Sequence, residues 1–293
     1  MNTDNIQIEN KEKRTVALSS IAAAVLLTVT KFVVGITTGS LGILSEALHS
    51  GLDLVAAVMT YFAVKFADRP PDKDHNWGHG KIENLSALGE TVLLFITCIW
   101  IIYEGVMRLS TGRTEITVNV WAFAVIILSI IVDISRSRAL MKVAKKYDSQ
   151  ALEADALHFS TDILSSSVVL SGLIGAAFNS HFADSIAALL VAVIVIKICY
   201  KIGKKSIDAL LDKSSAELLE KVSVLAMEIP DVKNVHDIRQ RNSGSQNFIE
   251  MNIHVSPNLT IEKAHEISHL VEEHIKATFK RSHVHVHTEP DEN

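Results

Sequence analysis

Two short stretches of the sequence place a histidine and an aspartate four residues apart in otherwise apolar surroundings. The stretch ALHSGLD contains His49 and Asp53, and the stretch ALHFSTD contains His158 and Asp162. Residues i and i+4 share one face of an α-helix, so each pair points one way. Two imidazoles and two carboxylates, with no thiolate, suit a divalent ion such as Zn²⁺ in tetrahedral geometry. The spacing therefore predicts one metal site between two helices.

Both pairs lie in segments that are apolar enough for a membrane, where an ionisable side chain costs at least ~2.5–3.5 kcal/mol. A lone histidine there often makes a helix–helix hydrogen bond, and a lone aspartate can be a packed, protonated carboxyl. Four such groups in two matched pairs favour a transported ion over polar packing. Glu46 and Asp155 precede the two histidines by three residues. They are expected either to orient the imidazoles or to lie near a helix end in contact with water.

Six apolar segments precede residue 205, each near the roughly 20 residues that span a bilayer core. They cover residues 15–37, 41–65, 86–108, 118–138, 152–178 and 182–201. The start, MNTDNIQIENKEKR, lacks the features of a signal peptide, so the first segment is expected to remain as a membrane helix. Lys and Arg collect before segment 1, between segments 2 and 3, between segments 4 and 5, and after segment 6. The positive-inside rule then predicts that both termini are cytoplasmic and that segments 2 and 5 run antiparallel.

Composition argues against two other classes of protein, nucleic-acid-binding proteins and disulfide-rich proteins. The net charge is −5 and no basic patch stands out, which gives no support for nucleic-acid binding. The two cysteines, Cys98 and Cys199, both lie in apolar segments and do not form a disulfide framework.

The chain from about residue 208 onward is polar and holds eight of the 13 histidines. SAELLEKVSVLAMEI has helical periodicity, VKNVHDIRQR and QNFIEMNIHV alternate like strands, TIEKAHEISHLVEEHIKATF is amphipathic, and HVHVHTEP reads as a last strand. The order α-β-β-α-β predicts a sheet backed by two helices. The expected architecture is an all-α six-helix transmembrane domain plus a small α+β cytoplasmic domain. Its parts are a cytoplasmic tail (1–14), a transport domain (15–207) and a metal-binding and dimerisation domain (208–293).

This combination resembles the cation diffusion facilitator family, the six-span divalent metal/proton antiporters. The resemblance covers nearly the whole chain, including the paired motifs, the loop DKDHNWGHGKIEN and the α-β-β-α-β order. It implies a ferredoxin-like tail, a homodimer in a bacterial cytoplasmic membrane, and transport at His49, Asp53, His158 and Asp162. Bacterial iron/zinc-efflux members often have Asp at the first position, whereas two-His, two-Asp quartets are associated with zinc. The implied activity is export of Zn²⁺ in exchange for protons, with Cd²⁺, Co²⁺, Fe²⁺ or Mn²⁺ as the alternative main substrate.

The loop between segments 2 and 3 carries a second candidate site. Asp72, His75 and His79 have metal-ligand spacing, although a solvated histidine loop is the default interpretation of this motif alone. The resemblance implies a second zinc site there. It also implies an ion pair between Lys81 and Asp212, at the hinge between membrane domain and tail.

The tail carries a third candidate site, where the resemblance implies a pair of structural or regulatory zinc ions between subunits. The matching ligand positions are His236, His265, His287 and Glu289. Asn252 stands where family members with this binuclear site have histidine, and His254, two residues on, is expected to substitute. The alternative is a histidine-rich surface that binds metal loosely.

One motif suggests an enzyme instead. HEISH, from His265 to His269, fits the H-E-x-x-H pattern of zinc proteases. That chemistry also needs a third ligand and a substrate cleft, for which a short tail leaves little room. A membrane-anchored metal-dependent enzyme using this helix is the alternative from another class, and the prediction is that the chain is not an enzyme.

Overall fold

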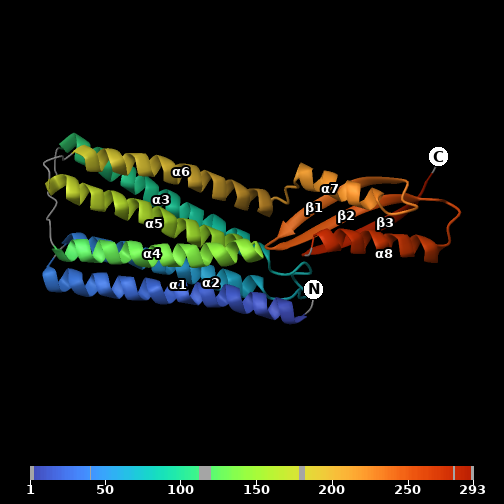
Figure 1. Ribbon diagram of the computed structural model, residues 1–293, viewed down its shortest axis with the longest axis horizontal. Coiled ribbons are helices and arrows are strands. Elements are labelled where there is room, and N and C mark those ends of the chain that lie inside the picture. The colour runs from blue at the N-terminus through green and yellow to red at the C-terminus, as the bar shows by residue number, and fades with distance from the viewer. Residues whose placement is uncertain (1–2, 40, 112–119, 178–181, 280, 292–293) are drawn as a thin grey trace.

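Six long helices lie side by side and lead into a small domain made of two shorter helices and a sheet (Figure 1). The computed structural model describes residues 3–39, 41–111, 120–177, 182–279 and 281–291. The long helices are α1 (Thr3–Thr38), α2 (Leu41–Ala67), α3 (Lys81–Thr111), α4 (Val120–Tyr147), α5 (Gln150–Ala177) and α6 (Phe182–Leu210).

Helix α5 has the most neighbours in the bundle, because it packs against α2, α3, α4 and α6. Helix α1 packs against α2 and α4, and α3 packs along α6. Small side chains line several of these contacts, and Ala56, Ala57, Ala151 and Ala156 are almost completely buried. Small residues let membrane helices approach closely, which brings the polar faces of α2 and α5 together.

The helices extend beyond the predicted apolar segments on the side of the tail. Helix α1 begins at Thr3 rather than near residue 15, and α4 continues to Tyr147 rather than ending near residue 138. Charged residues continue these helices because they find partners there, as when Lys146 donates to Glu12 at 2.6 Å. The predicted N-terminal tail is therefore helical from Thr3 onward. The predicted segment ends at 118 and 178 lie outside the described residues.

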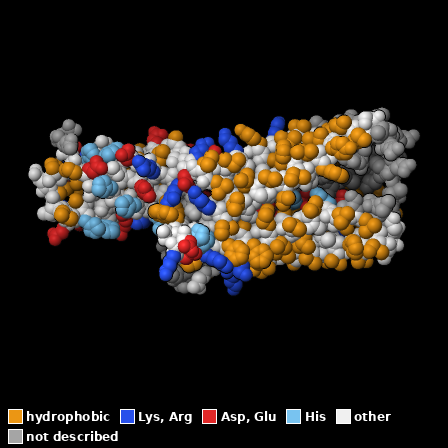
Figure 2. All heavy atoms as spheres, turned by 180° about the vertical axis from the view of Figure 1, so that it is seen from behind, with side chains coloured by type: hydrophobic (Ala, Val, Ile, Leu, Met, Phe, Trp, Pro, Cys, Tyr) orange, Lys and Arg blue, Asp and Glu red, His pale blue; other side chains and the backbone are white. Residues whose placement is uncertain are grey.

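Three of the described helices are long and apolar enough to cross a membrane by length and composition. They cover Gln7–Thr38, Glu46–Ala67 and Lys81–Trp100. Figure 2 shows apolar side chains spread over the visible face of the bundle, whereas Lys, Arg, Asp and Glu gather where the bundle meets the tail. The surface thus divides into an apolar body and a charged end.

The tail has the predicted α-β-β-α-β order, with α7 (Ala216–Met227), β1 (Asn234–Ser243), β2 (Gln246–Val255), α8 (Ile261–Thr278) and β3 (Ser282–Pro290). Strand β2 is central, antiparallel to β1 and parallel to β3. Its alternating side chains divide between two faces. Ile249, Met251 and Ile253 are buried in the core, while Asn252 and His254 lie half-buried on the other face.

The tail touches the bundle at the start of α3. Gly80 lies against the backbone of Ser243 so closely that a side chain at Gly80 would collide with it. The backbone N–H of Gly244 donates to Asn84 Oδ1 at 3.3 Å. The hairpin between β1 and β2 is thus seated on the end of the bundle.

Candidate metal centres

The two His-x-x-x-Asp pairs meet where α2 packs against α5. His158 Nε2 lies 3.1 Å from Asp53 Oδ1 and 3.6 Å from Asp162 Oδ2. His49 Nε2 lies 3.7 Å from Asp162 Oδ1 and 4.0 Å from Asp53 Oδ1. Each histidine therefore faces an aspartate of its own helix and one of the other helix. We call these four residues the quartet.

Burial distinguishes the members of the quartet. The side chains of His158, Asp162 and Asp53 are 6%, 11% and 12% exposed, whereas that of His49 is 35% exposed. Donor atoms of His49, Asp53 and Asp162 all lie within 4.8 Å of one another, close enough to share one ion. Two carboxylates this close and this buried need cationic or metal partners.

Glu46 and Asp155 direct their hydrogen bonds to α1. Lys31 Nζ lies 3.2 Å from Glu46 Oε2 and donates to Ser50 Oγ at 2.8 Å. Asp155 is fully buried and accepts from Ser20 Oγ at 3.4 Å. Among the described residues, neither acid hydrogen-bonds to an imidazole of the quartet. Both instead tie a quartet helix to α1.

Three buried ionisable groups on α3 and α4 were among those missed by the sequence reasoning. Glu90 on α3 is 2% exposed and accepts from Thr60 Oγ1 at 2.5 Å. On α4, Arg136 lies 3.3 Å from Asp133, and its guanidinium lies 3.5 Å from the centre of the Phe159 ring. All three stand inside the predicted apolar segments, so an ionisable residue within such a segment was the available signal.

The loop motif folds into a compact turn. Asp72 Oδ1 accepts from the backbone N–H of His75 at 2.7 Å, and Asp72 Oδ2 lies 3.3 Å from His79 Nε2. The imidazole centroids of His75 and His79 are 4.4 Å apart, and one donor atom from each of the three residues lies within 4.8 Å of the others. The hydrogen bonds from His75 lower the pKa of Asp72, which keeps this carboxylate charged and available to a cation.

The predicted hinge pair and an aromatic contact lie beside this loop. Lys81 Nζ is 2.8 Å from Asp212 Oδ1, with both side chains more than a third exposed. The Arg241 guanidinium lies 4.0 Å from the centre of the Trp77 ring, and Trp77 meets Phe248 edge-on at 5.2 Å. The loop is therefore held against the tail by stacking as well as by charge.

The tail brings together His236, His254 and Glu289. His236 Nε2 lies 3.1 Å from His254 Nε2 and 3.2 Å from Glu289 Oε2, and His254 Nε2 lies 3.4 Å from Glu289 Oε2. Sheet register explains the grouping, because His254 pairs with Glu289 on β3 and His236 pairs with Asn252. We call these three residues the tail trio.

Two neighbours of the tail trio differ in role. Asn252 Nδ2 donates to Glu289 Oε1 at 2.8 Å and so holds one oxygen of that carboxylate. His287 Nε2 lies 3.8 Å from the same oxygen and its side chain is 64% exposed. The structure thus places His287 at the edge of the trio.

His265 lies apart from the tail trio, on the exposed face of α8. Its ring packs edge-on against that of His269, with centroids 4.5 Å apart. Ile267 and Val271 form the buried side of the same helix. The two histidines of the HEISH motif therefore face solvent on one turn of α8.

Comparison with known proteins gives the family. Residues 17–211 match the family model described as the cation efflux transmembrane domain, and residues 215–291 match the cation efflux protein cytoplasmic domain. An uncharacterized transporter of Methanocaldococcus jannaschii is 33% identical over 273 residues, covering 91% of this chain and 95% of that protein. The cation-efflux pump FieF of Shewanella oneidensis is 29% identical over 279 residues, covering 93% of this chain and 92% of the pump.

Solved structures of MamM CTD variants are also similar to part of this chain. A MamM CTD variant in its cadmium form is 31% identical, with a TM-score of 0.26, and covers 26% of this chain and 98% of that chain. The prediction that the chain is not an enzyme is confirmed, since the families matched along the chain are transporters. The chain is an integral membrane protein of the cation diffusion facilitator family of cation-efflux transporters.

Proposed function

We propose that this protein exports Zn²⁺ from the cytoplasm in exchange for protons, using the quartet as its transport site. The observation that carries the proposal is the meeting of two His-x-x-x-Asp pairs from α2 and α5, with imidazole-to-carboxylate distances of 3.1 to 4.0 Å. Four nitrogen and oxygen donors at these distances can coordinate one small ion after slight movements of the side chains. Similarity to the cation-efflux pump FieF supports efflux as the direction.

The donor set favours zinc. Imidazole suits Zn²⁺, whereas Mn²⁺ prefers a site made of oxygen ligands. His49 gives the quartet a second imidazole, which balances it between nitrogen and oxygen donors. Transport of Cd²⁺, Co²⁺, Fe²⁺ or Mn²⁺ as the main substrate is the alternative.

Proton exchange follows from the chemistry of the same ligands. Metal binding requires neutral imidazole and charged carboxylate, so it releases protons from the quartet. When the site opens to a more acidic compartment, protonation of the imidazoles weakens metal binding and releases the ion. Rocking of helices around a fixed site near the midplane then alternates the side from which the site is reached.

The proposed arrangement has six membrane spans, with residues 1–14 and both termini in the cytoplasm. Residues 15–207 form the transport domain, and residues 208–293 form a ferredoxin-like cytoplasmic domain that joins two subunits. The loop residues Asp72, His75 and His79 and the tail trio are proposed to hold structural or regulatory zinc. Their donor atoms fit this role, because each set groups within 4.8 Å.

The test is metal flux in sealed proteoliposomes with an imposed pH gradient. The wild type is compared with Asp162→Ala and with Asp208→Ala, a matched control whose carboxylate pairs with Lys213 outside the quartet. We expect gradient-driven zinc flux in the wild type and the control and none in Asp162→Ala. Flux that ignores the gradient would remove proton exchange from the proposal. Flux that survives in Asp162→Ala would remove the quartet.

A further inference from the structure

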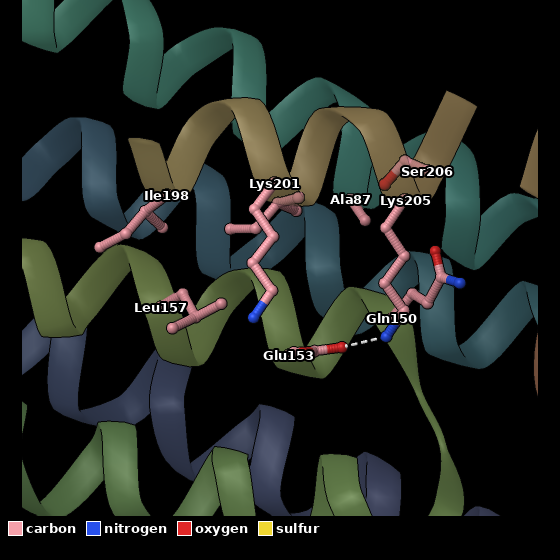
Figure 3. Close-up of a pocket in the computed structure, with 9 residues that line it drawn as sticks. Ala87, Gln150, Glu153, Leu157, Ile198, Lys201, Lys205 and Ser206 are labelled. Carbon is pink, nitrogen blue, oxygen red and sulfur yellow. Dashed lines mark hydrogen bonds and ion pairs between the residues drawn. The ribbon is translucent and has the colours of Figure 1, made fainter. Parts of the chain in front are cut away.

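A pocket opens between α5 and α6 near the end of the bundle that meets the tail (Figure 3). The residues that line it change from polar to apolar along its length. Leu157 and Ile198 form the apolar end, Gln150 and Ser206 lie at the polar end, and Lys201 lies between them (Figure 3). Because α5 runs away from the tail and α6 returns toward it, both helices pass from polar to apolar in the same direction. The pocket is therefore amphiphilic along the bundle axis.

Two buried polar groups in this pocket have no hydrogen-bond partner within the described part of the chain. Ser206 is 1% exposed and its Oγ is unpaired. Gln150 is 9% exposed and its Oε1 is unpaired. Buried polar groups are nearly always satisfied in native proteins, so an unpaired hydroxyl and an unpaired amide oxygen in one pocket point to a polar ligand.

The charges in the pocket indicate the sign of that ligand. Lys205 is already neutralised, since its Nζ lies 2.6 Å from Glu153 Oε2, as the dashed line in Figure 3 marks. Lys201 has no ion pair among the described residues, and its ammonium group extends from α6 toward α5 (Figure 3). The pocket thus offers an unpaired cation and an unpaired hydroxyl donor, which favours a ligand with an anionic group.

We propose that this pocket binds the headgroup of an anionic phospholipid, phosphatidylglycerol, with an acyl chain along the apolar end. The phosphate accepts a hydrogen bond from Lys201 Nζ, and the glycerol of the headgroup accepts one from Ser206 Oγ. Gln150 Oε1 accepts from a glycerol hydroxyl, a group that phosphatidylcholine lacks. Basic pockets between membrane helices recognise anionic headgroups in this way.

The surroundings of the pocket favour a lipid over a second protein chain. Val193, Ile194 and Tyr200 on α6 are exposed large side chains, as expected of a helix that faces acyl chains. The polar-to-apolar order of the lining also matches the order of headgroup and acyl chain at a bilayer surface. That match rests on the proposed membrane orientation, with the tail in the cytoplasm.

The test is native mass spectrometry of the full chain in detergent with added phosphatidylglycerol, phosphatidylcholine or inorganic phosphate. The variants are Lys201→Ala and Ser206→Ala. The matched control is Lys204→Ala, which removes an exposed lysine of the same helix from outside the pocket. This readout needs no metal flux, so it is independent of whether the quartet transports zinc.

We expect retention of phosphatidylglycerol but not phosphatidylcholine, and about tenfold weaker retention in Lys201→Ala and Ser206→Ala. Lys204→Ala should retain the lipid nearly as well as the wild type. Lys201→Gln, which keeps the length of the side chain, serves where Lys201→Ala does not fold. Equal retention of both lipids, an equal loss in Lys204→Ala, or displacement of the lipid by inorganic phosphate would each overturn the proposal.

Discussion

The quartet and the tail trio both consist of histidines and acidic residues, but different secondary structures bring these residues together. The quartet takes its four residues from two packed helices, where spacing of four residues sets each pair. The tail trio takes its three residues from three strands, where backbone pairing sets which residues are neighbours. Side chains of the trio are 23% to 35% exposed, whereas three of the four quartet side chains are 12% exposed or less.

This difference fits the proposed roles, which are transport at the quartet and regulation at the tail trio. Strands β1, β2 and β3 are joined by backbone hydrogen bonds, so the trio cannot separate without breaking the sheet. No backbone hydrogen bond joins α2 to α5 among the described residues, so we expect a small relative movement of these helices to open the quartet. Burial strengthens electrostatic interactions at the quartet, while water weakens them at the trio. The proposed transport cycle needs this property, because the quartet must bind the ion in one state and release it in another.

The largest expected effect separates the two sites by removing one carboxylate charge from each. Asp53→Asn should lower the initial rate of zinc flux at least about 100-fold, since it replaces a charged ligand that faces both histidines. Glu289→Gln should lower the rate by about fivefold or less, because the tail acts at a distance. Both rates are measured in the same proteoliposomes. Equal losses in the two variants would show that the two sites are not separable in function.

A second substitution tests the balance of donors in the quartet. His49→Asp converts one imidazole to a carboxylate and should shift the preference between zinc and manganese about tenfold toward manganese. His49→Ala serves as the control, because it removes the imidazole without supplying an oxygen donor. The ratio of the two flux rates is the measurement. An unchanged ratio in His49→Asp would mean that His49 does not set selectivity.

A third substitution tests whether Asn252 limits the tail trio. Asn252→His removes the hydrogen bond that occupies Glu289 and adds an imidazole between His236 and His287 in register. Zinc affinity of the tail should rise about tenfold, or 1.4 kcal/mol. The affinity is measured by calorimetry on the full chain. Asp53→Asn is included in every sample so that zinc binding at the quartet does not contribute to the signal. Asn247→His, the same change on the same strand, should leave the affinity as it was.

The smallest expected effect concerns the hinge between the two regions. Lys81 Nζ and Asp212 Oδ1 are 2.8 Å apart, but both side chains are more than a third exposed, so water screens the ion pair. A double-mutant cycle with Lys81→Ala and Asp212→Ala should give a coupling of about 0.2–1 kcal/mol in thermal unfolding. A much larger coupling would mean that the tail and the bundle are tied more firmly than the exposed geometry indicates.

Much of the fold followed from the sequence because its elements have strong local patterns. The α-β-β-α-β order of the tail was confirmed, since alternating and helical periodicities are local properties of the chain. Helix ends were less predictable. Charged residues such as Lys146 continue α4 because they pair with another helix, and no local pattern carries that information.

For the candidate sites too, local groupings were predictable from the sequence and contacts between elements were not. Spacing alone grouped His49 with Asp53 and His158 with Asp162, and similar spacing grouped the loop residues. Contacts between different elements could not be predicted from spacing. Examples are the hydrogen bond from Ser20 to Asp155 and the position of His265 away from the tail trio. Glu90, Asp133 and Arg136 were visible as charges in apolar segments, yet only packing reveals that they are buried.

By itself, the sequence determined the chemical types of the ligands, their spacing along each helix or strand, and the division into an apolar bundle and a polar tail. These follow from residue identity and from the fixed periods of helix and strand. Only the tertiary structure decided which pairs face each other, which acids bond to α1, and that Gln150 and Ser206 keep unpaired polar atoms in one pocket. Such contacts join residues far apart in the chain, and they depend on how whole helices pack rather than on any local pattern.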